Sequence, residues 1–532
     1  MKKILFLLIL FVSVAVYAEQ MPDNVFFRAM KDEMDRSMKG LQLKNQPKLF
    51  FMFYEVEERE KASVSSFSFG ADISPDKGEE MSDKDTSLQV YMQVGDQYNS
   101  SSEYEVENPS FLLGSDGFYG SYESLRQQFW ELTDLLYKDM VGIYRSKQNA
   151  KRKRNLKTTQ PDFSAAPLSH YIEPIKKVRF HDKTKVNHLL RQLSAEGKKY
   201  PFILDYHMTF SQECVNKYYL NSEGSFYQTS YCYMKPIIHL SMLTRDGKEE
   251  SLMWSKKWKF NEDWDKWAFL IRNKSEEMLH LAQVLYNGKD IQRPYQGPVL
   301  LDPSAARNFF LPVYFKYFVK TKPLLSSDGT KIGVPTTEKI GWEILSEELN
   351  VFSFPHRKFF EDDILDFQPI DLEGVWAEDL TLVEKGKLIN VPLTRSFVEG
   401  QTKSNGHGFR LNNNNIQSQA VNIMFDPIRS FPRKLLEEKF MEICKEKKKE
   451  FCYMIYQDHM ERVYSADGRR EVVHNAAHKF VDDSVLAFGD DLEVVRIGDA
   501  PWILPSVLLE KVEILPSDSS AKNPSPVPRP KP

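Results

Sequence analysis

A chain of 532 residues with 41% hydrophobic and 27% charged side chains is long enough for two or more folded domains, and its composition is that of an ordinary globular protein. Its 71 basic and 75 acidic residues give a net charge of −4, which is no reason to expect nucleic acid as a partner. Its four cysteines are too few for a disulfide-built scaffold, and no two of them have the C-x-x-C spacing of a zinc or redox site.

The first residues predict a secretory signal peptide. Lys2 and Lys3 precede the apolar run 4–16, and Val16-Tyr17-Ala18 has the small-x-small pattern of a signal-peptidase site. The apolar run has 13 residues, whereas a bilayer-spanning helix needs about 20. No later segment is long and apolar enough to cross a membrane. We therefore expect cleavage after Ala18 and a mature protein that is exported from a bacterium, either periplasmic or extracellular.

Hydrophobic spacing predicts the elements of the first half. Phe26, Met30, Met34 and Met38 recur every four residues and indicate a helix that ends near Gly40. The other expected elements are strands at 49–56 and 88–94, a long helix over 125–143, a shorter helix at 186–193 and a helix over 264–286, with a polar connector at 158–174 and a loop at 75–85.

A hairpin is predicted by two β-rich runs, 208–220 and 225–238, on either side of Asn221-Ser222-Glu223-Gly224. If it is centred near Glu223, residues whose numbers add to 446 face each other, which places Cys214 opposite Cys232. An oxidising compartment would favour a disulfide between them, whereas a slip of one residue would put them on opposite faces. Cys444 and Cys452 could bond or remain buried thiols.

Beyond residue 294 the pattern favours antiparallel strands, with turn signals at Asp328-Gly329, Lys385-Gly386 and Asp467-Gly468. One helix is expected over 432–447, and the last strand over 507–514. We therefore divide the chain into a signal peptide (1–18), an N-terminal α/β domain (19–293), a C-terminal antiparallel β domain (294–516) and a disordered Pro-rich tail (517–532).

Five short motifs occur along the chain in the order Y-L-N-S-E-G (219–224), G-P-V-L-L-D-P-S-A-A (297–306), D-L-E-G (371–374) with its following hairpin (380–388), S-N-G-H-G (404–408) and P-S-V-L-L-E (505–510). Together they resemble the TldD/PmbA family of zinc metallopeptidases, also called the modulator of DNA gyrase family, and their metal-free sister subunits. The resemblance implies an α+β fold, with an N-terminal α/β domain followed by a large curved antiparallel β domain that carries the site. It also implies a homodimer or a heterodimer, often of one metal-bearing and one metal-free subunit.

The zinc-binding signature of that family, His-Glu-x-x-x-His, is missing. Its expected place holds Leu311 and Pro312 for His-Glu, and Lys316 for the second His. Leucine has no lone pair for a metal, and a lysine ammonium repels a dication. Proline inside a helix also costs roughly 3 kcal/mol. We therefore expect no family zinc, no other cofactor and no intrinsic peptidase activity.

The candidate ligand-binding residues are those of the S-N-G-H-G loop and the two acids of D-L-E-G, namely Ser404, Asn405, Gly406, His407, Gly408, Asp371 and Glu373. Two glycines permit positive φ and close backbone approach, as a ligand-binding loop needs. The alternative is a tight turn in which Asn405 and His407 bond to the backbone. His474 and His478 have the spacing at which a helix can hold zinc, but the adjacent Glu is missing.

Three functions stay open from the sequence. The first is a metal-free, peptide-binding or partner subunit of a peptidase-type assembly. The second is an active metallopeptidase whose ligands come from elsewhere, such as His407, Asp371, His474 or His478. The third is an exported structural protein that shares only the fold. The aromatic residues between 309 and 318 either fill the unused metal site or line a hydrophobic peptide groove.

Overall fold

The computed structural model describes residues 20–516 except for 67–68, 71–82, 103–120, 157–160, 181, 261–262, 320–323, 333–335, 397, 399–400, 402, 411–415, 481–483 and 499. The predicted signal peptide (1–18), most of the predicted loop at 75–85 and the predicted tail (517–532) lie outside the described residues. Among those described, no helix combines the length and the apolar character that crossing a bilayer requires.

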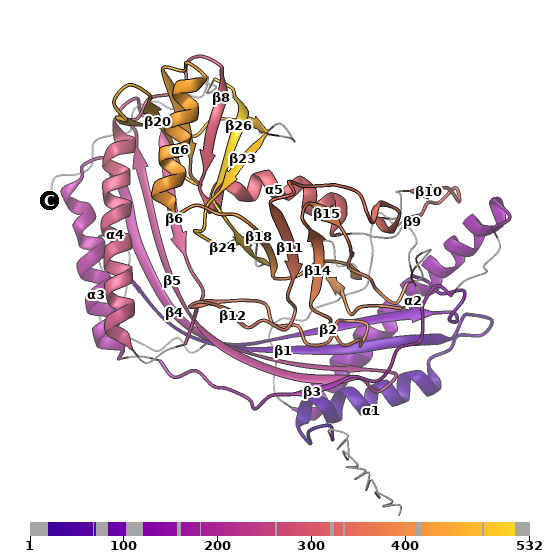
Figure 1. Ribbon diagram of the computed structural model, residues 1–532. Helices are drawn as coiled ribbons and strands as arrows, with labels where there is room; N and C mark the ends of the chain where they lie inside the picture. Colours follow the sequence, from indigo (N-terminus) through magenta and orange to yellow (C-terminus); the bar gives the residue numbers. More distant parts are fainter. Residues whose placement is uncertain are drawn as a thin grey trace, which may run out of the picture.

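A long, curved sheet of nine strands organises the first half of the chain (Figure 1). The elements are α1 (Val25–Gly40), β1 (Leu49–Ser66), β2 (Asp83–Val94), α2 (Tyr122–Lys153), β3 (His170–Ile172), α3 (Lys183–Ala195), a 3-10 turn (Glu196–Lys199), β4 (Ile203–Asn221), β5 (Phe226–Leu243), β6 (Glu249–Ser255), β7 (Trp258–Lys259) and α4 (Trp264–Tyr286). The main strand order is β12–β13–β7–β5–β4–β1–β2, where β12 (Phe359–Phe360) and β13 (Asp363–Ile364) come from the second half; β3 and β6 also pair with β5.

Alternation along the strands gives this sheet two different faces, because successive side chains point to opposite sides. Met52 and Tyr54 of β1 pack against α1 and α2, whereas Phe51 and Phe53 belong to a separate cluster with Ile370 of the second half. Further along the sheet, α3 and α4 cover the outer face in the same way. All four helices thus lie on the convex side, and the second half of the chain lies in the concave side (Figure 1).

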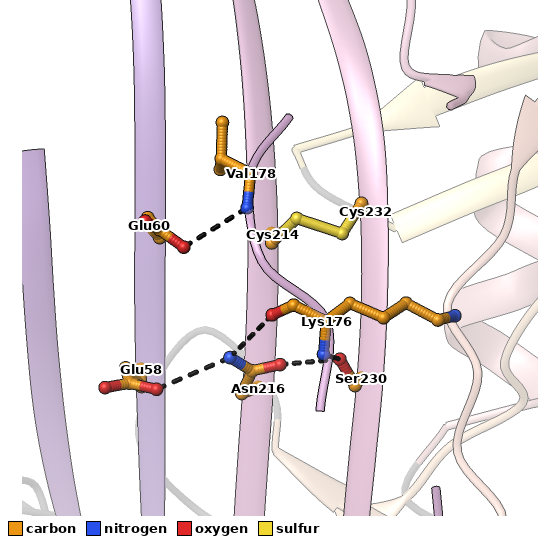
Figure 2. Close-up of a disulfide and its surroundings, with 8 residues drawn as sticks. All are labelled: Glu58, Glu60, Lys176, Val178, Cys214, Asn216, Ser230 and Cys232. Atoms are coloured by element: carbon orange, nitrogen blue, oxygen red, sulfur yellow. Dashed lines mark hydrogen bonds between the residues drawn. A yellow bond between two sulfur atoms is a disulfide. The ribbon is translucent and has the colours of Figure 1, made fainter. Parts of the chain in front are cut away.

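The predicted hairpin is the pair β4–β5, and its register places Cys214 opposite Cys232. The two sulfurs are joined in a disulfide. An extended stretch crosses these strands beside it (Figure 2): the Lys176 N–H donates to Ser230 Oγ at 2.8 Å, and the Val178 N–H donates to Glu60 Oε2 at 3.2 Å. Polar side chains thus fasten this stretch to the convex face.

The second half forms two smaller principal sheets around α5. Its elements are β8 (Tyr295–Leu301), α5 (Pro303–Tyr317), β9 (Leu324–Leu325), β10 (Lys331–Ile332), a 3-10 turn (Thr336–Lys339), β11 (Leu349–Ser353), β14 (Leu380–Glu384), β15 (Lys387–Leu388), β16 (Gly408–Arg410), β17 (Ile416–Ser418), β18 (Ile423–Pro427), α6 (Arg433–Glu446), β19 (Phe451–Ile455), β20 (Met460–Tyr464), β21 (Arg470–Val473), β22 (His478–Phe480), β23 (Val485–Phe488), β24 (Glu493–Ile497), β25 (Ala500–Leu504) and β26 (Val507–Ile514). One sheet has the order β15–β14–β11–β18–β25–β24, and the other β21–β20–β19–β8–β26–β22, with β23 also on β26.

Helix α5 packs in the main core of this half, where Phe310 and Tyr314 meet side chains from both sheets, such as Phe425 and Leu509. Helix α6 covers the other face of the β8 sheet, and a disulfide joins Cys444 of α6 to Cys452 of β19. The sequence 297–316 is therefore divided between a strand and a helix. The apolar G-P-V-L-L part is strand β8, paired on both sides.

The α+β class expected from the sequence is confirmed, with two differences of detail. The long, curved sheet lies in the first half, and each principal sheet of the second half contains one parallel pair, β8–β19 or β18–β25. In addition, Asp363 of β13 pairs with Trp258 of β7, so the second half extends the sheet of the first. Pairing between strands so distant in sequence leaves no local pattern from which it could be predicted.

Candidate functional site

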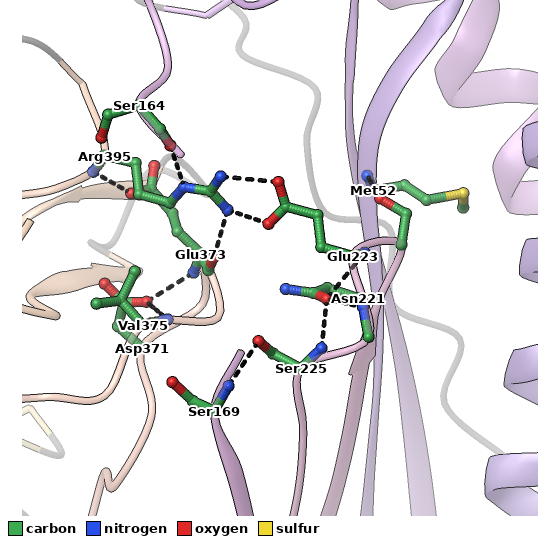
Figure 3. A network of polar contacts seen from close by, with 12 residues as sticks. Met52, Ser164, Ser169, Asn221, Glu223, Ser225, Asp371, Glu373, Val375 and Arg395 are labelled. Carbon is green, nitrogen blue, oxygen red and sulfur yellow. Dashed lines mark hydrogen bonds and ion pairs between the residues drawn. The ribbon is translucent and has the colours of Figure 1, made fainter. Parts of the chain in front are cut away.

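Two of the sequence motifs form turns that pack against each other where the halves of the chain meet (Figure 3). Asn221 Oδ1 accepts the N–H groups of Glu223, Gly224 and Ser225, at 2.9 to 3.1 Å, and so closes the β4–β5 turn. In the D-L-E-G motif, Asp371 Oδ1 accepts the N–H groups of Glu373 and Val375, at 3.0 and 2.9 Å. In both turns the side chain of an Asn or Asp accepts hydrogen bonds from backbone N–H groups that would otherwise bind water.

Gly374 is the point of contact between these turns. Its φ is +82°, and a Cβ built there would lie 2.1 Å from Asn221 Nδ2. A side chain at this position would therefore meet both a strained backbone and a hard clash. The conformation and the close approach explain why the second motif carries glycine here.

Arg395 joins the two turns electrostatically (Figure 3). Its guanidinium is 1% exposed and forms a two-pronged ion pair with Glu223, with Nη2 donating to Oε1 at 2.8 Å. It also donates to the carbonyls of Ser164 (2.7 Å) and Glu373 (3.1 Å), and it stacks 3.9 Å from the ring centre of Phe163. Its backbone N–H donates to Glu373 Oε2. A buried guanidinium is tolerated because its donors are satisfied in this way.

The S-N-G-H-G loop is fastened to the same turn. The Gly408 N–H donates to Asp371 Oδ2 at 2.8 Å. Asn405 bonds backbone on both sides, with Oδ1 accepting from the Leu393 N–H at 2.8 Å and Nδ2 donating to the Val391 carbonyl at 2.9 Å. Ser404 Oγ donates to the Leu393 carbonyl at 3.1 Å. Ser404, Asn405, Gly408, Asp371 and Glu373, which are five of the candidate residues, thus lie close together.

His407 lies fully buried in this loop. Nδ1 donates to the Asn405 carbonyl at 3.0 Å, and Nε2 pairs with Ser353 Oγ at 3.1 Å. Burial lowers the pKa of His407 to about 4, so the ring is neutral near pH 7. Both nitrogens are occupied within the protein, and a ligand would reach them only if the loop moved.

The two glycines of the loop meet different requirements. Gly406 has a φ of +73°, and a Cβ there would lie 2.3 Å from the Trp376 carbonyl oxygen. Gly408 does not adopt positive φ, which differs from the expectation; its small size instead allows the close approach of Asp371 and Glu373. Burial raises the pKa of Asp371 to about 6, although the three N–H groups it accepts oppose that rise.

The residues in place of the zinc signature lie elsewhere, on α5, beside a groove of about 1080 Å³. Phe309, Pro312 and Lys316 line it from the helix, and residues 343–346 and 476–480 line it from the other sides. Leu311 packs, half-buried, against the main core. A smaller cavity of about 300 Å³ shares Asn308 and residues 476–478 with the groove.

The family zinc does not fit at α5. The helix sequence, P-S-A-A-R-N-F-F-L-P-V-Y-F-K-Y, contains no His, Cys, Asp or Glu. Lys316, exposed on the groove side, adds a positive charge where a dication would need anionic or neutral donors.

His474 and His478 are not on a helix. His474 follows strand β21, and its Nδ1 lies 3.4 Å from Glu250 Oε1, whereas His478 begins β22 and its Nδ1 bonds the Ala476 carbonyl at 3.1 Å. Within the described part of the chain, a single group of three His, Cys, Asp or Glu side chains is close enough to share a metal: Asp205, His207 and His239. His407, Asp371, His474 and His478 do not belong to it.

Sequence reasoning missed both Arg395 and the Asp205–His207–His239 group. Nothing near Arg395 marks it, because its partner Glu223 is 172 positions away and the two meet only through the fold. A signal for the second group was available, since 207 and 239 add to 446, as 214 and 232 do, and the hairpin register places His207 opposite His239.

Comparison with known proteins gives two kinds of match. Residues 294–449 match the family described as the PmbA/TldA metallopeptidase C-terminal domain. No curated protein sequence is detectably similar to the chain.

Solved structures with the same architecture include two putative modulators of DNA gyrase. The one from Thermotoga maritima has a TM-score of 0.56 at 14% identity and covers 92% of this chain and 100% of its own. The one from Bacteroides thetaiotaomicron has a TM-score of 0.56 at 13% identity, over 92% and 99%. TldE from Thermococcus kodakarensis has a TM-score of 0.54 at 11% identity, over 92% and 100%. These structural matches establish a shared fold over nearly the whole chain.

Proposed function

We propose that this chain, whose residues 294–449 match the PmbA/TldA metallopeptidase C-terminal domain, belongs to the TldD/PmbA family and is an exported peptide-binding or partner subunit of a metallopeptidase-type assembly, without zinc peptidase activity of its own. The observation that carries the proposal is α5, which lines a large groove and has no metal ligand among its side chains. The predicted signal peptide supports export.

The lining of the groove supports a peptide with apolar and acidic side chains. Phe309, Tyr317 and Phe480 supply aromatic surface, and among the described lining residues Lys316 and Lys479 outnumber the one carboxylate, that of Glu343. A groove with apolar walls and a few charged groups is the usual form of a ligand site. Because Pro312 has no N–H, the carbonyl of Asn308, which also lines the groove, has no helical partner from that position. It can accept a hydrogen bond from a ligand.

Peptide binding is tested with two labelled peptides of equal length and equal apolar content, one carrying Glu and the other Lys at the remaining positions. We expect the mature chain to bind the acidic peptide, and Lys316→Glu to weaken that binding by about tenfold or more, because attraction becomes repulsion in a partly desolvated groove. Lys44→Glu is the matched control, because Lys44 is exposed and lies far from the groove residues in the sequence. Equal binding of both peptides, or an equal effect of the two variants, would contradict the proposal.

The absence of peptidase activity needs a separate test. Cleavage of unfolded substrates should be undetectable with the mature chain alone, with or without added Zn²⁺. The same assay is repeated with the double variant His207→Ala/His239→Ala. This variant lacks two members of the one group of three possible metal ligands among the described residues. Chelator-sensitive cleavage that persists in this double variant would establish a metallopeptidase with other ligands. Recovery of activity on adding a relative with an intact His-Glu-x-x-x-His would support the partner role.

A further inference from the structure

The concave face of the β4–β5 hairpin carries three metal-binding side chains in one place. His207 on β4 lies directly opposite His239 on β5, and Asp205 lies two residues before His207 on the same face. One donor atom from each of the three lies within 4.8 Å of the other two. The imidazole rings of the two histidines have their centres 4.7 Å apart.

One of these donors is buried without a partner. Ser251 Oγ lies 2.9 Å from His239 Nε2, and His239 Nδ1 is inaccessible and has no hydrogen bond. If Nε2 donates to Ser251, Nδ1 holds the ring's lone pair, which is the state of a metal-ligating histidine fixed by an outer hydrogen bond.

The remaining geometry is close to that of a bound ion. Asp205 Oδ2 lies 2.8 Å from His207 Nδ1, so the carboxylate already faces the imidazoles. Ligands of a tetrahedral zinc, each about 2.0 to 2.2 Å from the metal, are roughly 3.3 Å from one another. Small side-chain rotations would bring the donor atoms of the three residues from their present separations to that spacing. The side chains of Asp205 and His207 are 36% and 30% exposed, so an ion in solution has access to both.

We propose that Asp205, His207 and His239 bind one divalent transition-metal ion of the Zn²⁺ or Cu²⁺ class, at a site separate from the α5 groove. A site of two imidazoles and a carboxylate binds these ions in preference to Mg²⁺ or Ca²⁺. Met253 on β6 is the register partner of His239, is 59% exposed, and brings a thioether to the same face, which would add affinity for copper. The site does not depend on the function proposed above.

Calorimetry on the mature, chelator-treated chain tests the proposal with ZnCl₂ and CuCl₂ as probes. We expect one ion per chain, no binding of Mg²⁺, and a loss of affinity of about 100-fold or more in His207→Ala/His239→Ala. Asp205→Asn, which keeps the shape of the side chain, should weaken binding while leaving the metal-free unfolding curve unchanged. His280→Ala, an exposed histidine on α4, is the matched control and should bind as the wild type does.

A second double variant, His474→Ala/His478→Ala, separates this site from the neighbourhood of the groove. Unchanged binding in this variant supports the proposal, and anomalous scattering from a crystal grown with zinc should place the ion between β4 and β5. Met253→Leu should weaken Cu²⁺ binding more than Zn²⁺ binding, because a thioether is a soft donor that suits copper. The proposal is overturned if the wild type binds neither ion at micromolar concentration, or if His207→Ala/His239→Ala binds as tightly as the wild type.

Discussion

Arg395 shows how one side chain can hold distant segments together. It contacts Glu223 of the β4–β5 turn, the Ser164 carbonyl of the connector after α2, and Glu373 of the D-L-E-G turn. Three parts of the chain therefore meet at one buried positive charge. Removing it would take the buried donors away from the Ser164 and Glu373 carbonyls, whereas Glu223, whose side chain is 37% exposed, would keep contact with solvent.

We expect Arg395→Ala to lower the free energy of unfolding by roughly 3 to 5 kcal/mol, because it removes a buried side chain packed on Phe163 together with its hydrogen bonds to the Ser164 and Glu373 carbonyls. Arg28→Ala is the control. Arg28 pairs with Asp23 at 3.5 Å with both side chains largely exposed, and its loss should cost less than about 1 kcal/mol. Urea denaturation of both variants measures the difference. Equal effects would mean that the Arg395 network contributes no more than a surface pair.

His407 and Asp371 make opposite contributions to the pH dependence of stability. The folded-state pKa of His407 is lowered from 6.5 to about 4, so the unfolded chain binds the proton first and stability falls as the pH drops through that interval. The pKa of Asp371 is raised from 3.8 to about 6, so its contribution is largest at low pH and is lost as the pH rises towards 6. The two effects partly cancel in the wild type.

Single substitutions should separate these contributions. His407→Gln removes the titrating ring, so the stability advantage of the wild type over this variant should be largest near pH 7 and shrink by at most about 3 kcal/mol as the pH falls to about 4.5. Asp371→Asn should show the opposite trend over the same interval. Chemical denaturation at several pH values measures both. A pH-independent difference for His407→Gln would show that its pKa is not lowered by folding.

At the scale of elements, the two Asx-closed turns act as one unit because glycine permits their contact. Gly374 brings the D-L-E-G turn onto Asn221, and Gly406 brings the S-N-G-H-G loop onto the backbone at Trp376. The motifs are thus far apart in the sequence but in direct contact in the folded protein. They position the concave face of the long sheet against the second half of the chain.

Gly374→Ala should destabilise the protein more than a glycine replacement at a comparable backbone angle elsewhere. Gly341 has a φ of +95° and open space around it, so Gly341→Ala isolates the backbone strain, roughly 1 to 2 kcal/mol. The clash of the new Cβ with Asn221 Nδ2 should add at least about 1 kcal/mol at position 374. Thermal unfolding of the two variants provides the comparison, and similar losses would contradict a tight contact between the turns.

Local periodicity was enough to predict most helices and the main hairpin. The expected helix over 264–286 coincides with α4, and the register of β4–β5 followed from the turn alone. The additions of β12 and β13 to the long sheet were beyond prediction, because such pairing depends on closure of the whole fold. The length of β4 was also underestimated, since the strand begins at Ile203, before the expected run 208–220.

The candidate site was predictable only where a motif marked it. The S-N-G-H-G and D-L-E-G residues were identified and lie together, yet their burial could not be foreseen, because the side chains that cover them come from Ser353 and Arg395. The groove at α5 was foreseen as one of two alternatives for the aromatic residues. Its volume depends on segments 343–346 and 476–480, which carry no pattern of their own.

At the scale of the whole molecule, covalent and noncovalent links reinforce each other. All four cysteines are paired, one disulfide within the long sheet and the other between α6 and β19. Disulfides persist in oxidising compartments and are rare in the bacterial cytoplasm. This pairing agrees in chemistry with the export predicted from the first 18 residues.

Exported and cytoplasmic preparations should therefore differ. The exported chain is expected to begin at Glu19 and to expose no thiol to an alkylating reagent after unfolding, as intact-mass spectrometry can measure. The chain without residues 1–18, made in a reducing cytoplasm, should carry four alkylatable thiols and unfold at lower denaturant, since each disulfide contributes about 2 to 4 kcal/mol. An exported protein that retains residues 1–18, or that has free thiols, would argue against this account.

The pairing of β13 with β7 has a consequence for the order in which the chain is made. Synthesis delivers β7 about a hundred residues before β13, and Arg395, which fastens the β4–β5 turn, arrives later still. Until then the edge of β7 offers unpaired backbone groups to any neighbouring strand. A nascent chain of this protein thus carries a short sheet edge that is covered only after its second half has been made.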